Sequence, residues 1–199
     1  IVIDHTTTSA NLSKEMNTAL LLKDCYFIDA PVSGGQSGAE GGNLSIMVGG
    51  DARAYDDSKD IFNSYSKFHK LMGSSGSGQL TKMVNQICIA GLIQALAEGM
   101  NFSEKAGLNT SDVMEVITKG AAQSWQMENR WKTMLADEYD HGFAVDLMRK
   151  DLNIASEEAI KIGADIEITN LVNRFYKDVQ DLGGNRLDTS SLLRRLKEK

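Results

Sequence analysis

The sequence is poor in the residues that build disulfide frameworks and rigid turns. Among 199 residues it has two cysteines and one proline. Cys25 and Cys88 lie far apart and have no histidine partners at metal-site spacing, so we expect buried, reduced thiols. His5, His69 and His141 likewise show no pattern typical of a catalytic triad or a metal centre. The sequence therefore predicts neither a disulfide scaffold nor a bound metal.

The chain also lacks an excess of positive charge. It has 21 basic and 27 acidic residues, which gives a net charge of −6. Because an acidic surface repels phosphate, and no basic stripe with interleaved aromatic residues is visible, we expect no nucleic-acid partner. The longest uncharged apolar stretch, residues 83–97, is interrupted by three amide side chains and is too short for a bilayer. No charged and apolar leader suggests export. We expect a cytoplasmic protein without a membrane partner.

The chain contains two regions that differ in their hydrophobic period. Up to about residue 72, strand-like and helix-like stretches alternate, which is typical of an open α/β sheet, and beyond Gly78 every stretch indicates a helix. We predict strands at 1–4, 26–30, 44–48 and 67–71, and helices at 10–23, 52–63, 78–105, 111–119, 124–137, 144–162, 169–182 and 187–198. Six methionines in the second region are expected to fill its core, namely Met83, Met100, Met114, Met127, Met134 and Met148.

The most informative segment spans residues 73–86, where a glycine-rich turn leads into a long apolar helix with Lys82 in its first turns. Helix N-termini present unpaired N–H groups and a partial positive charge. A lysine there should therefore pair with a bound anion or have its proton loosened. Either condition suits a lysine that exchanges a proton with a carbonyl or hydroxyl group. The alternative is a solvated lysine on a helix surface.

A second segment, residues 29–35, follows a strand-like run and contains the only proline of the chain. Gly34 and Gly35 allow a tight turn whose N–H groups can cradle a carboxylate, and the Ser33 hydroxyl is a further donor. The alternative is an ordinary loop between strands. The two segments together are a more specific signal than either one alone.

Four blocks in this order and spacing resemble the β-hydroxyacid dehydrogenases, which include 3-hydroxyisobutyrate dehydrogenase and tartronate semialdehyde reductase. The blocks are residues 2–8, 29–50, 76–86 and 143–152, so the resemblance covers nearly the whole chain. It implies an α/β remnant of a Rossmann-type sheet over residues 1–76. An all-α dimerisation and substrate domain, similar to the carboxyl-terminal domain of 6-phosphogluconate dehydrogenase, would follow over residues 77–199. The fold would be mainly α overall.

The resemblance also implies roles for individual residues. Lys82 resembles the catalytic lysine, which donates a proton to the carbonyl oxygen in reduction and takes it back in oxidation. The turn at residues 33–35 resembles the loop that holds the substrate carboxylate. Asn85 and Gln86, three and four residues after Lys82, resemble the amides that orient the substrate. Some members have asparagine where this chain has Gln86, so either amide could make that contact.

Further roles concern the cofactor and the substrate pocket. Thr7 resembles the hydroxyl residue near the nicotinamide, and Lys150 with Asp151 resembles the pair that closes over cofactor and substrate. Lys150 could alternatively be an exposed helix residue. Trp125 resembles a pocket residue that limits the substrate's side chain, and the alternative is a core tryptophan. The resemblance implies NAD or NADP as cofactor and a small carboxylate-bearing hydroxy acid as substrate.

The chain departs from the family in one respect. Members carry a glycine fingerprint after their first strand, and no glycine pair of this sequence has the required spacing. We therefore expect an incomplete portion of an oxidoreductase, inactive by itself, that interconverts a short β-hydroxy acid and its semialdehyde or keto form. The alternatives are a catalytically incompetent helical oligomerisation or binding fragment and an imine reductase-like enzyme, although the latter group usually replaces the lysine. The resemblance also implies a homodimer or homotetramer.

Overall fold

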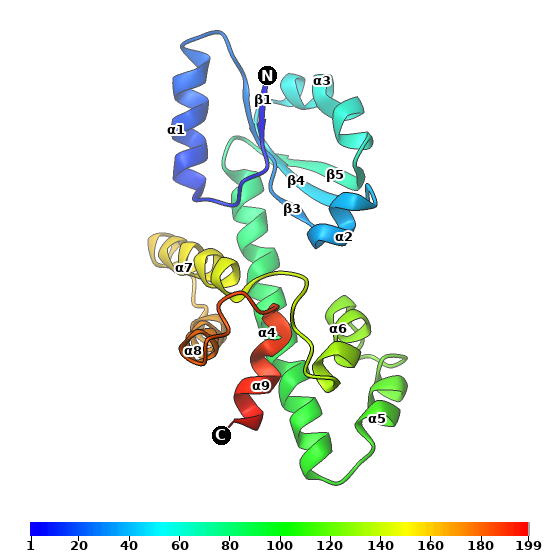
Figure 1. Ribbon diagram of the computed structural model, residues 1–199. Helices are drawn as coiled ribbons and strands as arrows, with labels where there is room; N and C mark the ends of the chain where they lie inside the picture. Colours follow the sequence, from blue (N-terminus) through cyan, green and yellow to red (C-terminus); the bar gives the residue numbers. More distant parts are fainter. Residues whose placement is uncertain (199) are drawn as a thin grey trace. The chain divides into compact units, whose positions relative to one another are not determined.

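The computed structural model describes residues 1–198 and divides the chain into two compact units. Unit 1 is Ile1–Asn85, and unit 2 comprises the residues from Gln86 onward. The long helix α4 (Ser77–Lys105) begins in unit 1 and continues into unit 2 (Figure 1). The predicted boundary after residue 76 coincides with the first residue of α4, and the domain roles stay predictions.

Unit 1 is a mixed β-sheet flanked by helices. β1 is parallel to β2, whereas β4 is antiparallel to β2 and β3 and parallel to β5. Helix α1 packs against β2, and α3 packs against β5 (Figure 1). The elements are β1 (Val2–Asp4), α1 (Ala10–Leu21), β2 (Phe27–Asp29), β3 (Val32–Ser33), α2 (Gly35–Glu40), β4 (Leu44–Gly49), α3 (Ala52–Asn63) and β5 (Ser66–Gly73).

The predicted strands and helices of unit 1 are all present, and two further short elements were not predicted. β3 continues the line of β2, because both pair with β4 in one register, and the Met47 N–H donates to the Pro31 carbonyl between them at 3.0 Å. Helix α2 is six residues long and has no buried residue, so no apolar period marks it in the sequence. Its first residue is the second glycine of the predicted turn.

Over residues 86–198, the regular elements of unit 2 are helices, apart from one isolated β-bridge. Besides the rest of α4 it contains α5 (Thr110–Ile117), α6 (Trp125–Leu135), α7 (Val145–Ile162), α8 (Glu167–Asp181), a 3₁₀ turn (Thr189–Ser191) and α9 (Leu192–Lys197). The prediction of a single helix over residues 187–198 is wrong at its start. The Asp188 carboxylate accepts from the Ser190 N–H at 3.0 Å and from the Phe143 N–H at 2.8 Å, and these bonds fix a tight turn before α9.

The core of unit 2 is rich in methionine, as predicted. Five of the six methionines join one cluster with aliphatic and aromatic residues of α4, α6, α7, α8 and α9, and Met83 is buried in unit 1. The prediction of buried thiols is wrong, since Cys88 is exposed on α4 and Cys25 is half-buried. Cys88 falls on the one side of this apolar helix that the core does not cover.

Helix α4 spans residues 77–105, almost the range of 78–105 that the sequence predicts. It has 29 residues, and its most apolar 18-residue window has a mean hydropathy of 1.3, so by length and composition it could cross a membrane. The uncharged stretch at 83–97, which we expected to be too short, is only part of this helix. Since 44% of the window is buried inside the protein, and core helices of soluble proteins meet the same criteria, this is weak evidence for a membrane-spanning role.

Two glycines of α4 should respond oppositely to the same substitution. A Cβ at Gly78 would lie 2.4 Å from the Met47 carbonyl oxygen, whereas a Cβ at Gly91 would meet nothing within 4 Å. Alanine favours a helix over glycine by about 0.5–1 kcal/mol. We expect Gly91→Ala to raise the free energy of unfolding by this amount and Gly78→Ala to lower it, measured by urea denaturation. Equal changes in the free energy of unfolding for the two variants would contradict the close approach of α4 to β4.

Candidate active site

Four cross-strand neighbours form a row across the sheet of unit 1. Asp4 pairs with Asp29, Asp29 with Gly49, and Gly49 with Gly73. The loop after β1, the segment from β2 to β3 and the glycine-rich segment before α4 therefore meet along one line. These are the segments that the sequence analysis singled out, so the sheet brings them together.

The carboxylate of Asp29 holds the start of α4 on this row. Asp29 is fully buried, and its two oxygens accept from the Gly76 N–H at 2.7 Å and from the Gln79 N–H at 3.1 Å. A Cβ at Gly49 would lie 2.7 Å from both carboxylate oxygens and from the Gly78 nitrogen. The glycines therefore permit close contact between helix and sheet. The helix N-terminus that we expected to attract a bound anion is occupied by the protein's own carboxylate.

Lys82 lies in the second turn of α4 and only 6% of it is exposed. Its ammonium group donates to the Val32 carbonyl oxygen at 2.8 Å. Val32 directly precedes Ser33, so the lysine lies beside the predicted substrate turn. The alternative of a solvated surface lysine is excluded by this burial. Asn85 and Gln86 follow Lys82 on the same helix, and Asn85 is half-buried.

The turn at residues 33–35 has the backbone that the sequence predicts. Gly34 and Gly35 have φ angles of 142° and 63°, which residues with side chains rarely adopt. A Cβ at Gly34 would also approach the Leu44 side chain to 3.0 Å. Ser33 is half-buried and both glycines are exposed. The turn therefore presents its backbone to solvent next to the lysine's hydrogen-bond partner.

Thr7 lies in a short loop, residues 6–8, which we call the 6–8 loop. The side chain of Gln79 binds both ends of this loop: its Oε1 accepts from the Thr8 N–H at 3.0 Å, and its Nε2 donates to the Thr6 carbonyl at 2.7 Å. Gln79 is fully buried. The peptide groups on either side of Thr7 are thereby tied to the first turn of α4.

His5 anchors the start of the same loop. Its Nδ1 lies 2.6 Å from the Ala30 carbonyl, to which it must donate, so in neutral His5 Nε2 is the acceptor for the Tyr65 hydroxyl at 2.9 Å. Burial raises the pKa of Tyr65, which keeps that hydroxyl protonated. The loop therefore enters from β1 in a fixed direction.

The remaining predicted site residues belong to unit 2. The buried Gln86 amide donates to Asp151 Oδ2 at 2.7 Å, and the Lys150 ammonium lies 3.0 Å from Asp151 Oδ1. Asp151 is 2% exposed on its side chain, whereas the Lys150 side chain is 45% exposed. Asp151 thus binds Gln86 and Lys150, an arrangement suited to orienting both. Its predicted contact with a cofactor stays a prediction.

Trp125 is the first residue of α6 and is half-exposed, which excludes the alternative of a core tryptophan. The Arg130 guanidinium lies 5.0 Å from the centre of its ring, a cation–π distance. Arg130 in turn pairs with the buried Asp188 carboxylate at 3.2 Å. Asp188 and Arg130 therefore hold the indole on the surface of unit 2.

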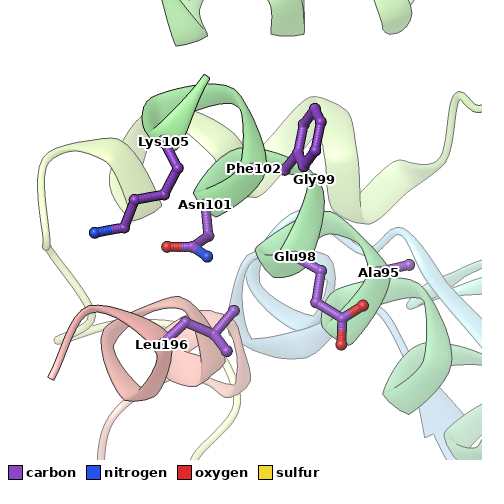
Figure 2. A pocket seen from close by; sticks show the side chains of 7 residues that line it. All are labelled: Ala95, Glu98, Gly99, Asn101, Phe102, Lys105 and Leu196. Atoms are coloured by element: carbon purple, nitrogen blue, oxygen red, sulfur yellow. The ribbon is translucent and has the colours of Figure 1, made fainter. Parts of the chain in front are cut away.

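A shallow pocket of about 610 Å³ lies elsewhere in unit 2, between the second half of α4 and α9 (Figure 2). Phe102, Glu98 and Lys105 line it together with Leu196. None of the predicted site residues contributes to it. Among residues 1–198, no group of three or more histidine, cysteine or acidic side chains could hold a metal ion.

The sequence analysis did not identify two residues that hold the site of unit 1 together, Asp29 and Gln79. Asp29 lay inside a segment that we had singled out, but nothing marked its side chain as the cap of a helix almost fifty residues later. Gln79 lay three residues before Lys82, where a polar side chain in a first helical turn is common. Only the pairing of distant segments gives these two residues their partners.

Comparison with known proteins matches both regions of the chain to one family. A sequence model described as the NAD-binding domain of 6-phosphogluconate dehydrogenase matches residues 1–83. A second, described as NAD-binding of NADP-dependent 3-hydroxyisobutyrate dehydrogenase, matches residues 76–196. The two matches meet within the first turns of α4.

Individual relatives agree with these matches. An uncharacterized oxidoreductase of Shewanella frigidimarina is 54% identical over 198 residues, covering 100% of this chain and 68% of that protein. The 2-hydroxy-3-oxopropionate reductase of Escherichia coli is 36% identical, covering 85% of this chain and 58% of the enzyme. The structure of Mycobacterium tuberculosis 3-hydroxyisobutyrate dehydrogenase with L-serine has a TM-score of 0.88 at 27% identity, covering 98% of this chain and 69% of that one.

The capping role of Asp29 predicts a large loss of stability on its removal. Asp29→Ala leaves two buried N–H groups without a partner, and each unsatisfied group costs about 1–3 kcal/mol. We expect the free energy of unfolding to fall by about 2–6 kcal/mol in urea denaturation. Asp51→Ala is the matched control, since Asp51 caps α3 at the surface, where a lost cap costs about 1 kcal/mol. A loss no larger than the control's would contradict the role of Asp29.

Proposed function

The chain belongs to the 3-hydroxyisobutyrate dehydrogenase family of NAD(P)-dependent hydroxyacid dehydrogenases, and from this premise we propose that it carries the catalytic lysine and the substrate turn of such an enzyme. The reaction would interconvert a short β-hydroxy acid and its semialdehyde or keto form. The chain spans 58–69% of the length of the relatives described above, so the proposal concerns the full-length protein.

The observation that carries this proposal is the position of Lys82. A lysine that is 6% exposed and bound to the Val32 carbonyl has a fixed ammonium group one residue from Ser33. In the reductive direction Nζ donates a proton to the substrate's carbonyl oxygen, and in the oxidative direction it takes the proton from the hydroxyl. Burial limits competition from water for that proton.

The substrate turn supports a small substrate with a carboxylate. Ser33 offers a hydroxyl, and Gly34 and Gly35 are exposed and have unusual φ angles, so their backbone N–H groups are proposed to bind an anion. Asn85 and Gln86 are proposed to orient the substrate, and the bond from Gln86 to Asp151 would fix the amide for that purpose. The half-exposed Trp125 is proposed to limit the size of the substrate's side chain.

The residues present fit the nicotinamide end of NAD or NADP. The 6–8 loop carries three successive threonines, whose hydroxyl groups can bind ribose or carboxamide groups, and Gln79 holds its backbone in place. It follows the carboxyl end of β1, where ligands of α/β sheets bind. When bound, the cofactor takes or gives the hydride. The chain would contribute Thr7 to hold the nicotinamide and the partly exposed Lys150 to cover it.

Assembly and location complete the proposal. Three large apolar side chains of α4 are exposed in this chain: Val84 at 60%, Leu92 at 43% and Phe102 at 73%. Such side chains favour burial against another subunit, which supports a homodimer or homotetramer. We expect the oligomer to be cytoplasmic. Of the alternative functions, an imine reductase-like enzyme is disfavoured by the buried lysine, and so is a purely structural fragment.

The proposed role of Lys82 is tested by its removal from the full-length protein. Because general acid–base catalysis contributes about 100- to 10,000-fold, Lys82→Ala should lower kcat for short β-hydroxy acids by that factor. Cofactor affinity, measured by fluorescence titration with NADH and NADPH, should change little.

Lys67→Ala is the control. This exposed lysine lies in the same unit on β5, and its removal should leave kcat unchanged. Unchanged turnover in Lys82→Ala, with wild-type turnover clearly measurable, would remove Lys82 from the mechanism. Absence of turnover in the unsubstituted protein with every hydroxy acid and both cofactors would overturn the proposed function itself.

A further inference from the structure

The 6–8 loop has two sets of anchors. Asp4 and His5 tie its start to unit 1's strands: Asp4 Oδ1 accepts from the Thr6 N–H at 2.9 Å, and His5 binds the Ala30 carbonyl. Ser9 caps α1 by accepting from the Leu12 N–H at 3.1 Å. These contacts fix the two ends of the segment that contains the loop, but they do not relate the loop to α4.

Gln79 supplies that relation. Both the oxygen and the nitrogen of its carboxamide form hydrogen bonds to the loop. Their partners are the two backbone groups that flank Thr7, the Thr8 N–H and the Thr6 carbonyl. The partners are 71 and 73 residues away in sequence. Because a buried amide costs free energy unless it is hydrogen-bonded, the fully buried side chain favours this one position of the loop.

The main chain of Gln79 is fixed independently of its side chain. Its N–H donates to the buried Asp29 carboxylate at 3.1 Å, and Asp29 is itself part of the central sheet. Residue 79 is therefore held by the sheet on one side while it holds the loop on the other. Lys82 lies three residues further along, one turn of the same helix.

We propose that Gln79 is a positioning residue that sets Thr7 relative to Lys82. The inference deepens the proposed function and rests on it, since Thr7 is assigned to the nicotinamide side and Lys82 to the substrate's oxygen. One turn of helix fixes the distance between residue 79 and Lys82. The hydrogen bonds from the Gln79 carboxamide to the 6–8 loop then fix the position of Thr7 relative to Lys82. Gln79 itself touches neither substrate nor cofactor in this role.

Gln79→Met in the full-length protein tests the inference, because methionine has a similar length and neither amide group. Misplacement by about 1 Å can cost about 100-fold in rate. We expect kcat to fall by about 10- to 100-fold, with a smaller change in KM for the hydroxy acid. The Thr8 amide should also exchange its hydrogen with solvent faster, as measured by NMR without substrate or cofactor.

A double-mutant cycle with Thr7→Ala separates positioning from general damage. If Gln79 acts by placing Thr7, then Gln79→Met should have little effect on kcat once the Thr7 hydroxyl is gone. Its effect on the free energy of unfolding should be the same in both backgrounds. A merely structural role would lower kcat by the same factor with and without Thr7.

The matched control is Gln94→Met, which removes another buried glutamine from α4. The Gln94 amide donates to Glu98 within the same helix and has no part in the site, so kcat should be unchanged. If Gln79→Met does not fold, Gln79→Glu takes its place. Glutamate keeps the oxygen that accepts from Thr8 and loses the donor to Thr6, so the same cycle applies.

The outcomes separate the two proposals. Unchanged exchange at Thr8 in Gln79→Met would overturn the proposed anchoring of the 6–8 loop by Gln79, whatever the activity. Faster exchange with unchanged kcat, or with equal losses in both backgrounds, would overturn the positioning role. If the unsubstituted protein has no turnover, the proposed function fails and the positioning role fails with it. Faster Thr8 exchange in Gln79→Met would still confirm that Gln79 anchors the 6–8 loop.

Discussion

The site of unit 1 depends on one buried carboxylate. Asp29 accepts from two N–H groups at the start of α4 and so binds this 29-residue helix to strand β2 of the sheet. A buried charge is tolerated because backbone donors and the positive end of the helix stabilise it. The part of the site that α4 carries takes its position from this contact. Lys82, Gln79 and the glycine-rich segment all belong to the helix start that Asp29 holds.

Close approach explains why glycines recur around this carboxylate. Gly49 and Gly78 lie where a Cβ would collide with Asp29 or with the neighbouring backbone, whereas Gly34 and Gly35 provide φ angles that other residues avoid. The first pair serves packing and the second serves the exposed turn. The glycine-rich segment before α4 thus has a structural purpose, and the turn that we propose to bind an anion lies in the other segment.

Different residues have different proposed tasks at the site: some react with or bind the substrate, and others hold neighbouring side chains in place. Lys82 and the turn at residues 33–35 are proposed to supply the reactive and binding groups, while Gln79, Asp151 and Arg130 contact other predicted site residues. Gln79 and Asp151 are buried polar side chains, whose hydrogen-bonding groups need partners. Such contacts position a neighbouring side chain, and the proposed reaction requires that kind of order.

The sequence by itself determined the α/β-then-helical order, nearly all of the helices and strands, and the two segments that carry the site. Hydrophobic period, glycine spacing and helix caps are local properties, so they can be read from neighbouring residues. It did not reveal the turn before α9, the exposure of Cys88, or the partners of Asp29 and Gln79. Tertiary structure decided these, because each depends on which distant segments meet, and the pairing of a buried polar side chain leaves no mark at its own position in the chain.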